Sequence, residues 1–204
     1  MNPYRQRVWQ QMQLLLDDLE SPPASILDFG SGDGWFSLRV KEFFPSAEIT
    51  SIDVKKRDKV FREALLYEPG SPLPFDAASF ELAYAVDVLH HCHSPEYYLD
   101  ELARVSRRYL LIKDHTWENR WQFWALAVLD EMGNRRFGIP SPQHYQYSSQ
   151  WTEHLKLRGW ALRQMIHPSP CHVGALGALT NRLQYIALYE RLEPGPEAVK
   201  LHSR

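Results

Sequence analysis

The clearest chemical signature in the sequence is a run of three alternate glycines, Gly30, Gly32 and Gly34. Two apolar residues and Asp28 precede the run, and apolar residues recur after it at helical spacing. This order predicts a strand at 25–29, a tight turn and a helix up to residue 44. Glycine suits such a turn because it adopts unusual backbone angles and lets a ligand approach the bare backbone. The first N–H groups of the following helix lack partners inside the helix, so a ligand can use them.

The spacing of the glycines separates two classes of ligand. Dinucleotide-binding enzymes use G-x-G-x-x-G, whose third glycine lets the helix pack closely on the strand. Here the spacing is G-x-G-x-G, and the bulky Trp35 stands where that third glycine would be. A carboxylate at the strand end, Asp28, suits a ligand with an ammonium group better than a pyrophosphate. An NAD(P)-dependent oxidoreductase is therefore disfavoured, and a glycine-rich turn without any ligand is the simplest alternative.

Other polar residues stand at the ends of further predicted strands. Strands that alternate with helices form a parallel sheet, and open parallel sheets bind ligands at the carboxyl ends of their strands. An acid at the end of the second strand can accept hydrogen bonds from both ribose hydroxyls. The strand-end residues are Asp53 at the end of 48–54, Glu68 after 63–67, Asp87 after 80–86, and Asp114 with His115 after 109–113.

Two blocks of sequence resemble the class I S-adenosylmethionine-dependent methyltransferases. Residues 26–37 are similar to motif I of that class, D/E-x-G-x-G-x-G. Residues 87–91, D-V-L-H-H, and 112–115, I-K-D-H, resemble a bacterial subgroup of the type 11 methyltransferases, which act on small molecules. The likeness covers about residues 26–115. It implies an α/β fold with a Rossmann-like, seven-stranded, mostly parallel sheet, helices on both faces, and an antiparallel last strand.

The same resemblance implies S-adenosylmethionine as cofactor, with S-adenosylhomocysteine as product, and it indicates the contacts. They are Asp28, Gly30, Ser31 and Gly32 for the methionine portion, Asp53 with Val54 for the ribose, Glu68 and Leu73 for the adenine, and Asp87, Val88 and Leu89 beneath the sulfonium.

We predict that His115 is the general base for the methyl acceptor, because imidazole titrates near neutral pH. Asp114 is the rival, since neighbours in a strand face opposite ways and only one of the two should point into the pocket. Catalysis by positioning alone is the remaining alternative, because the methyl group is already activated in the cofactor.

A short run of potential metal ligands, His90, His91, Cys92 and His93, follows the strand at 80–86. Adjacent residues point in different directions, and no second pair at ligand spacing follows. We therefore predict no metal, and expect His90 and His91 to line the methionine end of the site or to start the next helix.

Residues 116–147 are predicted to be a largely helical insertion that acts as a lid or binds the substrate. Within it Trp117, Trp121, Trp124 and Val128 recur at helical spacing. Such a stripe either belongs to the core or forms an aromatic wall of the pocket.

The remaining pattern predicts one methyltransferase domain over residues 1–204. An amphipathic helix is expected at 4–20, where it packs against the sheet or covers the pocket. Its start is expected to be solvated, and the alternative is that Tyr4 or Arg5 reaches the cofactor. Strands are expected at 160–166 and 183–190, with a loop at 167–181 between them.

Composition excludes several functional classes. The net charge is −2, and basic residues are scattered, so no nucleic-acid partner is predicted. No apolar run approaches the length of a membrane span, the start lacks a signal-peptide core, and the two cysteines imply no disulfide framework, so a cytoplasmic enzyme is expected. The alternative is a binding module that holds S-adenosylmethionine without catalysis. The sequence identifies neither the acceptor nor the oligomeric state.

Overall fold

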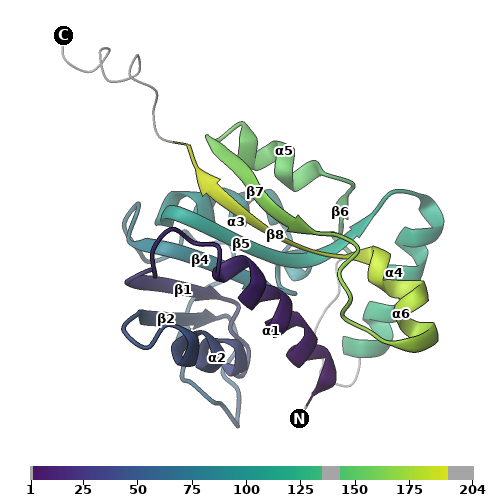
Figure 1. The fold of residues 1–204 in the computed structure, drawn as a ribbon, viewed down its shortest axis with the longest axis horizontal. Helices are drawn as coiled ribbons and strands as arrows, with labels where there is room; N and C mark the ends of the chain where they lie inside the picture. Colours follow the sequence, from purple (N-terminus) through teal and green to yellow (C-terminus); the bar gives the residue numbers. More distant parts are fainter. Residues whose placement is uncertain (1, 135–142, 193–204) are drawn as a thin grey trace.

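The computed structural model describes residues 2–134 and 143–192. At its centre is a twisted sheet with helices on both faces (Figure 1). The strands are β1 (Ser25–Phe29), β2 (Glu48–Asp53), β3 (Leu65–Leu66), β4 (Phe80–Val86), β5 (Ser106–Trp117), β6 (Gln146–Tyr147), β7 (Trp160–Ile166) and β8 (Gln184–Arg191). The helices are α1 (Pro3–Leu16), α2 (Trp35–Phe43), α3 (Pro95–Val105), α4 (Arg120–Asn134), α5 (Gln150–Lys156) and α6 (Gly174–Thr180), with 3₁₀ turns at Leu89–His91 and Asn181–Leu183.

The strand order confirms the predicted fold class. Seven strands run in the order β3-β2-β1-β4-β5-β8-β7, and the short β6 pairs separately with the end of β5. Strands β1 to β5 are parallel, whereas β8 runs antiparallel to both β5 and β7. The direction of winding reverses between β1 and β4, and ligands of such sheets bind at that switch point.

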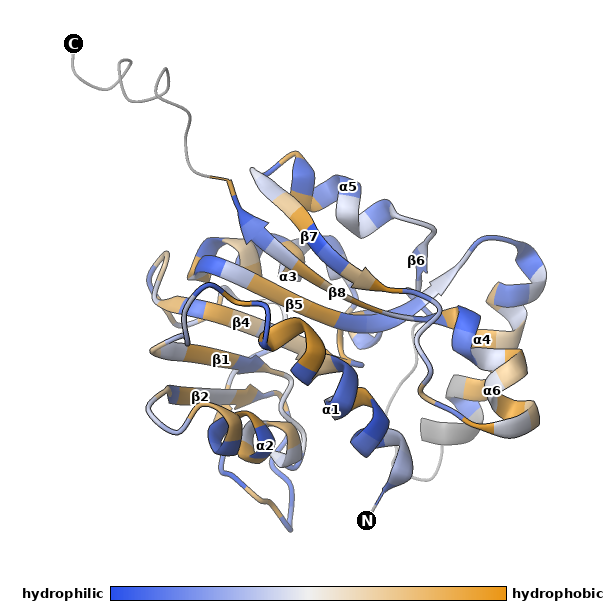
Figure 2. Ribbon diagram, in the orientation of Figure 1, coloured by the Kyte–Doolittle hydropathy of each residue, from blue (hydrophilic) through white to orange (hydrophobic). Residues whose placement is uncertain are grey.

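Two buried clusters attach the helices to opposite faces of the sheet. Apolar residues of α1 and α2, such as Met12 and Val40, pack with Ile26 and Leu188 on one face. Residues of α3 and α5, such as Leu102 and Trp151, pack on the other. Figure 2 shows the central strands mostly in the colours of apolar residues, as expected for a sheet covered on both sides.

Several predicted boundaries differ from the structure. The helix predicted at 4–20 ends at Leu16, the strand predicted at 63–67 is only Leu65–Leu66, and β5 extends from Ser106 to Trp117. The segment 167–181, predicted as a loop, contains α6. Its glycines, Gly174 and Gly177, lower helix propensity and conceal the element in the sequence.

The tryptophan stripe is not part of the core. Trp121, Trp124 and Val128 are 86%, 56% and 57% exposed, and α4 instead buries Leu126 and Ala127. The core interpretation is therefore wrong for these three residues, whereas Trp117 is partly buried and packs against the cluster that contains Leu126. None of the members of the stripe lines the cavity described below, so the stripe does not form a pocket wall either. Within the described part of the chain, no helix is long and apolar enough to cross a membrane.

Candidate active site

The glycine turn has the geometry that its sequence predicts. Gly30, Gly32 and Gly34 all have positive φ, at 69°, 59° and 74°. A Cβ on Gly30 would lie 2.5 Å from Val88, and one on Gly34 would lie 2.7 Å from the backbone oxygen of Arg62. A Cβ on Gly32 would meet no atom within 4 Å. The outer glycines are thus required for packing, whereas Gly32 faces open space.

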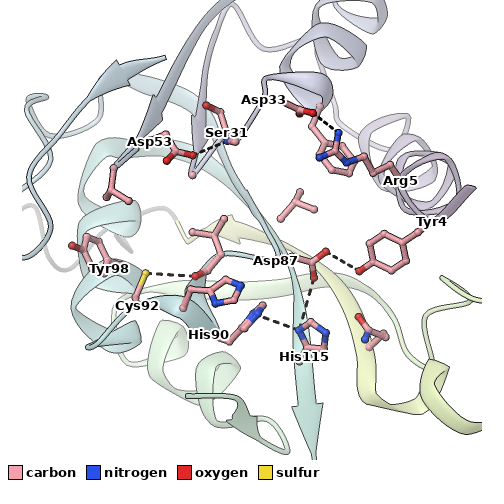
Figure 3. A pocket seen from close by; sticks show the side chains of 18 of the residues that line it. Tyr4, Arg5, Ser31, Asp33, Asp53, Asp87, His90, Cys92, Tyr98 and His115 are labelled. Carbon is pink, nitrogen blue, oxygen red and sulfur yellow. Dashed lines mark hydrogen bonds and ion pairs between the residues drawn. The ribbon is translucent and has the colours of Figure 1, made fainter. Parts of the chain in front are cut away.

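That open space is a cavity of about 1140 Å³ at the carboxyl ends of β1, β2, β4 and β5. Figure 3 shows side chains from these strand ends, from α1 and from the following turns pointing into it. Of the predicted cofactor contacts, those that line the cavity are Gly30, Ser31, Gly32, Asp53, Val54, Asp87 and Val88.

Two groups beside the turn fit the hydroxyl-rich and ammonium-bearing cofactor. The carboxylate of Asp53 accepts hydrogen bonds from the N–H of Gly32 at 2.7 Å and of Lys55 at 2.8 Å, which fixes it at the cavity edge. Ser31 Oγ is buried and has no hydrogen-bond partner among the described residues. Since a buried hydroxyl normally has a partner, Ser31 is placed to bind a ligand in the cavity.

Four predicted contacts lie elsewhere. Asp28 is buried behind the turn, where its carboxylate accepts a hydrogen bond from Ser37 of α2, and burial raises its pKa to about 7. Glu68 is exposed, while its neighbours Tyr67, Pro69 and Gly70 line the cavity. Leu73 and Leu89 are buried and do not line it. In this structure none of the four residues lines the cavity, and the ligand contacts predicted for them stay predictions.

A buried polar network joins α1 to the strand ends. Lys113 is fully buried and forms an ion pair with Asp87 and a hydrogen bond with Gln184. The hydroxyl of Tyr4 donates to Asp87 at 2.7 Å. Burial raises the pKa of Asp87, but Lys113 and His115 outweigh it, so the pKa is lowered overall and the carboxylate stays charged. Arg5 pairs with Asp33 at 2.7 Å. The solvated helix start predicted for Tyr4 and Arg5 is therefore wrong, because both side chains line the cavity.

The side chains of Asp114, His90 and His115 form a second polar cluster, and His115 of this cluster lies 3.9 Å from Asp87. Asp114 is fully buried, and its carboxylate lies 2.5 Å from Nδ1 of His90 and 3.4 Å from Nδ1 of His115. It also accepts from the backbone N–H of Leu89 and His115. His115 lines the cavity and Asp114 does not, as the alternation of a strand requires. Burial and the neighbouring His90 lower the pKa of His115, so its imidazole is neutral at pH 7.

These three residues also offer one metal-ligand atom each within 4.8 Å. The 2.5 Å separation of Asp114 and His90 is a hydrogen-bond distance. Two ligands of a tetrahedral zinc ion at 2.0–2.1 Å would be about 3.3 Å apart. The geometry therefore matches a hydrogen-bonded cluster, and the sequence-based expectation of no metal stays a prediction. Sequence reasoning did not foresee this cluster, because His90 lies in the 3₁₀ turn after β4, whereas Asp114 and His115 lie on β5, far away in the sequence.

Helices α4 and α6, which are neighbours in Figure 1, both line one end of the cavity, and Leu129 and Leu176 are partly exposed there. We call this end the mouth. Leu126 and Leu129 of α4 line it on one side, and Leu176 and Thr180 of α6 on the other. His172, in the turn before α6, stacks against Tyr4 with ring centroids 5.0 Å apart. The sequence analysis missed this part of the site because α6 was not recognised as a helix.

Comparison with known proteins identifies the family. A model described as "Methyltransferase domain" matches residues 1–165. The chain belongs to this methyltransferase family. Membership of this family implies the use of S-adenosylmethionine and agrees with the predicted enzyme class. No curated protein matches the sequence.

Solved structures with the same fold are distant in sequence. An S-adenosylmethionine-dependent methyltransferase from Mesorhizobium loti has a TM-score of 0.64 at 14% identity, over 91% of this chain and 98% of that one. One from Aquifex aeolicus has a TM-score of 0.61 at 16% identity, covering 94% of each chain. The [4+2]-cyclase SpnF has a TM-score of 0.63 at 16% identity, over 93% of this chain and 82% of that one. These similarities support the fold and leave the substrate to be inferred from the site.

Proposed function

We propose that this protein transfers the methyl group of S-adenosylmethionine to a small-molecule acceptor. The observation that carries the proposal is the cavity beside Gly32, where Ser31 Oγ is buried without a partner among the described residues and Asp53 is fixed by two backbone N–H groups. The bound cofactor would supply a methyl group already activated on a sulfonium.

The chain's own residues would mainly bind and orient the two reactants. Ser31 and the backbone at Gly30 and Gly32 would hold the methionine portion, and Asp53 with Val54 the ribose. Asp87 and Val88 form the floor between the cofactor end and the acceptor end. Orientation of this kind can contribute several kcal/mol to a displacement that needs no further activation.

We propose His115 as the group that accepts the proton of the acceptor. Its ring lines the cavity on the acceptor side of Asp87, and its lowered pKa keeps it neutral and able to accept a proton at pH 7. Asp114 is a weaker candidate because its carboxylate is fully buried and already accepts several hydrogen bonds. Of the insertion predicted at 116–147, the described residues 116–134 and 143–147, which include α4, are proposed to cover the acceptor, and residues 135–142 lie outside the described part of the chain.

Two measurements test the proposal. Calorimetry with S-adenosylhomocysteine tests cofactor binding, and a screen of small hydroxyl and amine compounds with radiolabelled S-adenosylmethionine tests transfer. Binding together with label transfer supports the proposal. Binding without transfer to any compound class supports the non-catalytic module. No binding of S-adenosylhomocysteine rejects both.

A further inference from the structure

The end of the cavity that would receive the acceptor is apolar where it opens to the surface. Leu126 is buried at its wall, whereas Leu129 and Leu176 are 38% and 48% exposed and stand on opposite sides of the mouth. Leu129 belongs to α4 and Leu176 to α6, so two separate helices each place an apolar side chain at this end of the cavity.

The apolar surface continues outward from that mouth. On α6, Leu179 is 72% exposed and lies one helical turn from Leu176. On α4, Val128 and Trp124 are exposed one turn apart, next to Leu129 in the chain. Figure 2 shows apolar residues on α6 beside α4. Adjacent exposed apolar side chains on a soluble domain mark a binding surface more often than isolated ones do.

The charged groups that line the cavity are already paired. Arg5 pairs with Asp33, Arg57 lies 4.0 Å from Asp53, and Lys113 neutralises Asp87. Every charged Asp or Arg that lines the described cavity is in one of these pairs. Arg57 is the most loosely paired, with its Nε unpartnered among the described residues, but it follows β2 beside the proposed ribose site. At the α4–α6 end, an acceptor with a carboxylate or phosphate would meet no unpaired cation among the described lining residues.

His115 and His172, which line the cavity at this end, add no positive charge to it. Burial lowers the pKa of both His115 and His172, so both rings are neutral at pH 7. The polar groups near them bond within the protein, since Gln184 accepts from Lys113 and Thr180 donates to the backbone oxygen of Leu176. The acceptor end thus combines neutral polar groups inside with leucines at the opening.

From this arrangement we infer that the acceptor is an uncharged amphipathic molecule, with its nucleophilic hydroxyl or amine at His115 and an apolar chain or ring system leaving between Leu129 and Leu176. This inference rests on the proposed function and specifies its substrate class. Transfer of the methyl group from sulfonium to the acceptor oxygen or nitrogen would break the S–C bond, form the O–C or N–C bond, and release the acceptor proton to His115.

The test is a series of para-alkylphenols with two to eight chain carbons, titrated by calorimetry into the protein saturated with S-adenosylhomocysteine. Burial of one methylene is worth about a fourfold change in Kd. We expect Kd to fall by about that factor for each added carbon until the chain passes the mouth. A phenol of equal length that ends in a carboxylate should bind at least tenfold more weakly.

Variants at the mouth and away from it make the test specific. Leu176→Asp and Leu129→Asp should remove the chain-length dependence while S-adenosylhomocysteine still binds. Leu157→Asp is the matched control, because Leu157 is 84% exposed and lies outside the cavity. Affinity that is independent of chain length, or unchanged in Leu176→Asp, would overturn the inference although the proposed function stands. Failure of the wild type to bind S-adenosylhomocysteine would instead reject the proposed function.

Discussion

Asp53 is the residue on which ribose recognition is proposed to depend. Its carboxylate is 4% exposed, lines the cavity and is held by two backbone N–H groups. Asp53→Ala should weaken S-adenosylhomocysteine binding by about 2–3 kcal/mol, the scale of lost hydrogen bonds to a charged group. Calorimetry measures this, with thermal unfolding as a check that the variant is folded.

Glu68→Ala provides the matched control for Asp53. Glu68 follows the next strand but is exposed and lies outside the cavity lining. Its removal should leave the affinity within about twofold, a change below 0.5 kcal/mol. If Asp53→Ala also stayed within twofold of the wild type, the ribose assignment would be rejected.

The proposed base, His115, predicts a particular dependence of rate on pH. A general base acts in its deprotonated form, and burial together with His90 lowers the pKa of His115. The rate should therefore hold as the pH falls to 6.5 and decline only below it. His115→Ala should reduce kcat by about 10²-fold or more and remove this acid limb.

The control for His115 is a histidine with a carboxylate partner but away from the cavity. His154 lies 2.8 Å from Asp100 and is not among the lining residues, so His154→Ala should keep the wild-type profile. The measurement is kcat against pH with any acceptor found in the screen. A His115→Ala enzyme with unchanged turnover and acid limb would show that positioning alone suffices.

At the scale of elements, the glycines of the turn between β1 and α2 have different roles. Gly30 and Gly34 are needed for packing, whereas Gly32 is proposed to be needed for ligand binding. A Cβ at Gly32 enters open space on the cavity side. Gly32→Val should therefore abolish S-adenosylhomocysteine binding and cost the fold only the strain of a side chain at positive φ, about 1–2 kcal/mol.

Gly159→Val is the matched substitution for that test. Gly159 has φ of 79°, also faces open space, and lies after α5 and outside the cavity lining. Both variants should lose similar stability in denaturant unfolding, whereas only Gly32→Val should lose binding. Equal affinity in the two folded variants would show that the ligand does not approach Gly32.

The same turn illustrates what the sequence could and could not predict. The alternation of apolar strands, glycines and amphipathic helices is local, and it was sufficient for β1, α2, β4, α3 and the sheet type. The direction in which Asp28 points depends on α2 packing over the strand, and no local pattern contains that contact. Tyr4 reaches Asp87 across 83 residues of sequence for the same reason.

Helices α4 and α6 show a second limit of prediction from sequence. A periodic stripe on α4 indicates that a helix has an apolar face, but not that this face is the buried one. Trp121 is exposed because Leu126 and Ala127 occupy the side that contacts Tyr145 and Leu183. Two glycines hide α6 in the sequence, although Leu176 and Thr180 of this helix line the cavity.

At the scale of the whole molecule, Asp28 should couple stability to pH. Burial raises its pKa to about 7 in the folded protein, above the unfolded value near 3.9. Asp28 then binds more protons in the folded state between these values, so its contribution to the free energy of unfolding should fall as the pH rises from 4 to 7 and level off above 7. The lowered pKa values of His115 and His172 contribute with the opposite sign, equally in the wild type and in the variant described next. A shift of three units corresponds to about 4 kcal/mol.

Comparison with Asp28→Asn isolates this contribution. The amide is neutral and can still accept a hydrogen bond from Ser37, so the variant should gain stability relative to the wild type as the pH rises from 5 to 8. The lowered pKa values of Asp87 and Asp114 act below pH 4, outside this window. Urea unfolding at several pH values, without ligand, measures the difference. Parallel curves for the two proteins would show that Asp28 does not titrate in this range.

Ligand binding should also stabilise the whole chain, because the cavity joins α1, the strand ends and the α4–α6 mouth. A ligand at 100 times its Kd adds about 2.7 kcal/mol to the free energy of unfolding if it binds only the folded state. For a protein of this size, each kcal/mol raises Tm by about 2–4 °C, so saturating S-adenosylhomocysteine should raise it by about 5–10 °C.

NADH should leave the Tm unchanged, since Trp35 replaces the third glycine of the dinucleotide turn and Ser31 and Asp53 provide no cation for a pyrophosphate. Gly32→Val should lose the shift and Gly159→Val should keep it, which ties the effect to the cavity. A shift with NADH and none with S-adenosylhomocysteine would reverse the assignment of the cofactor.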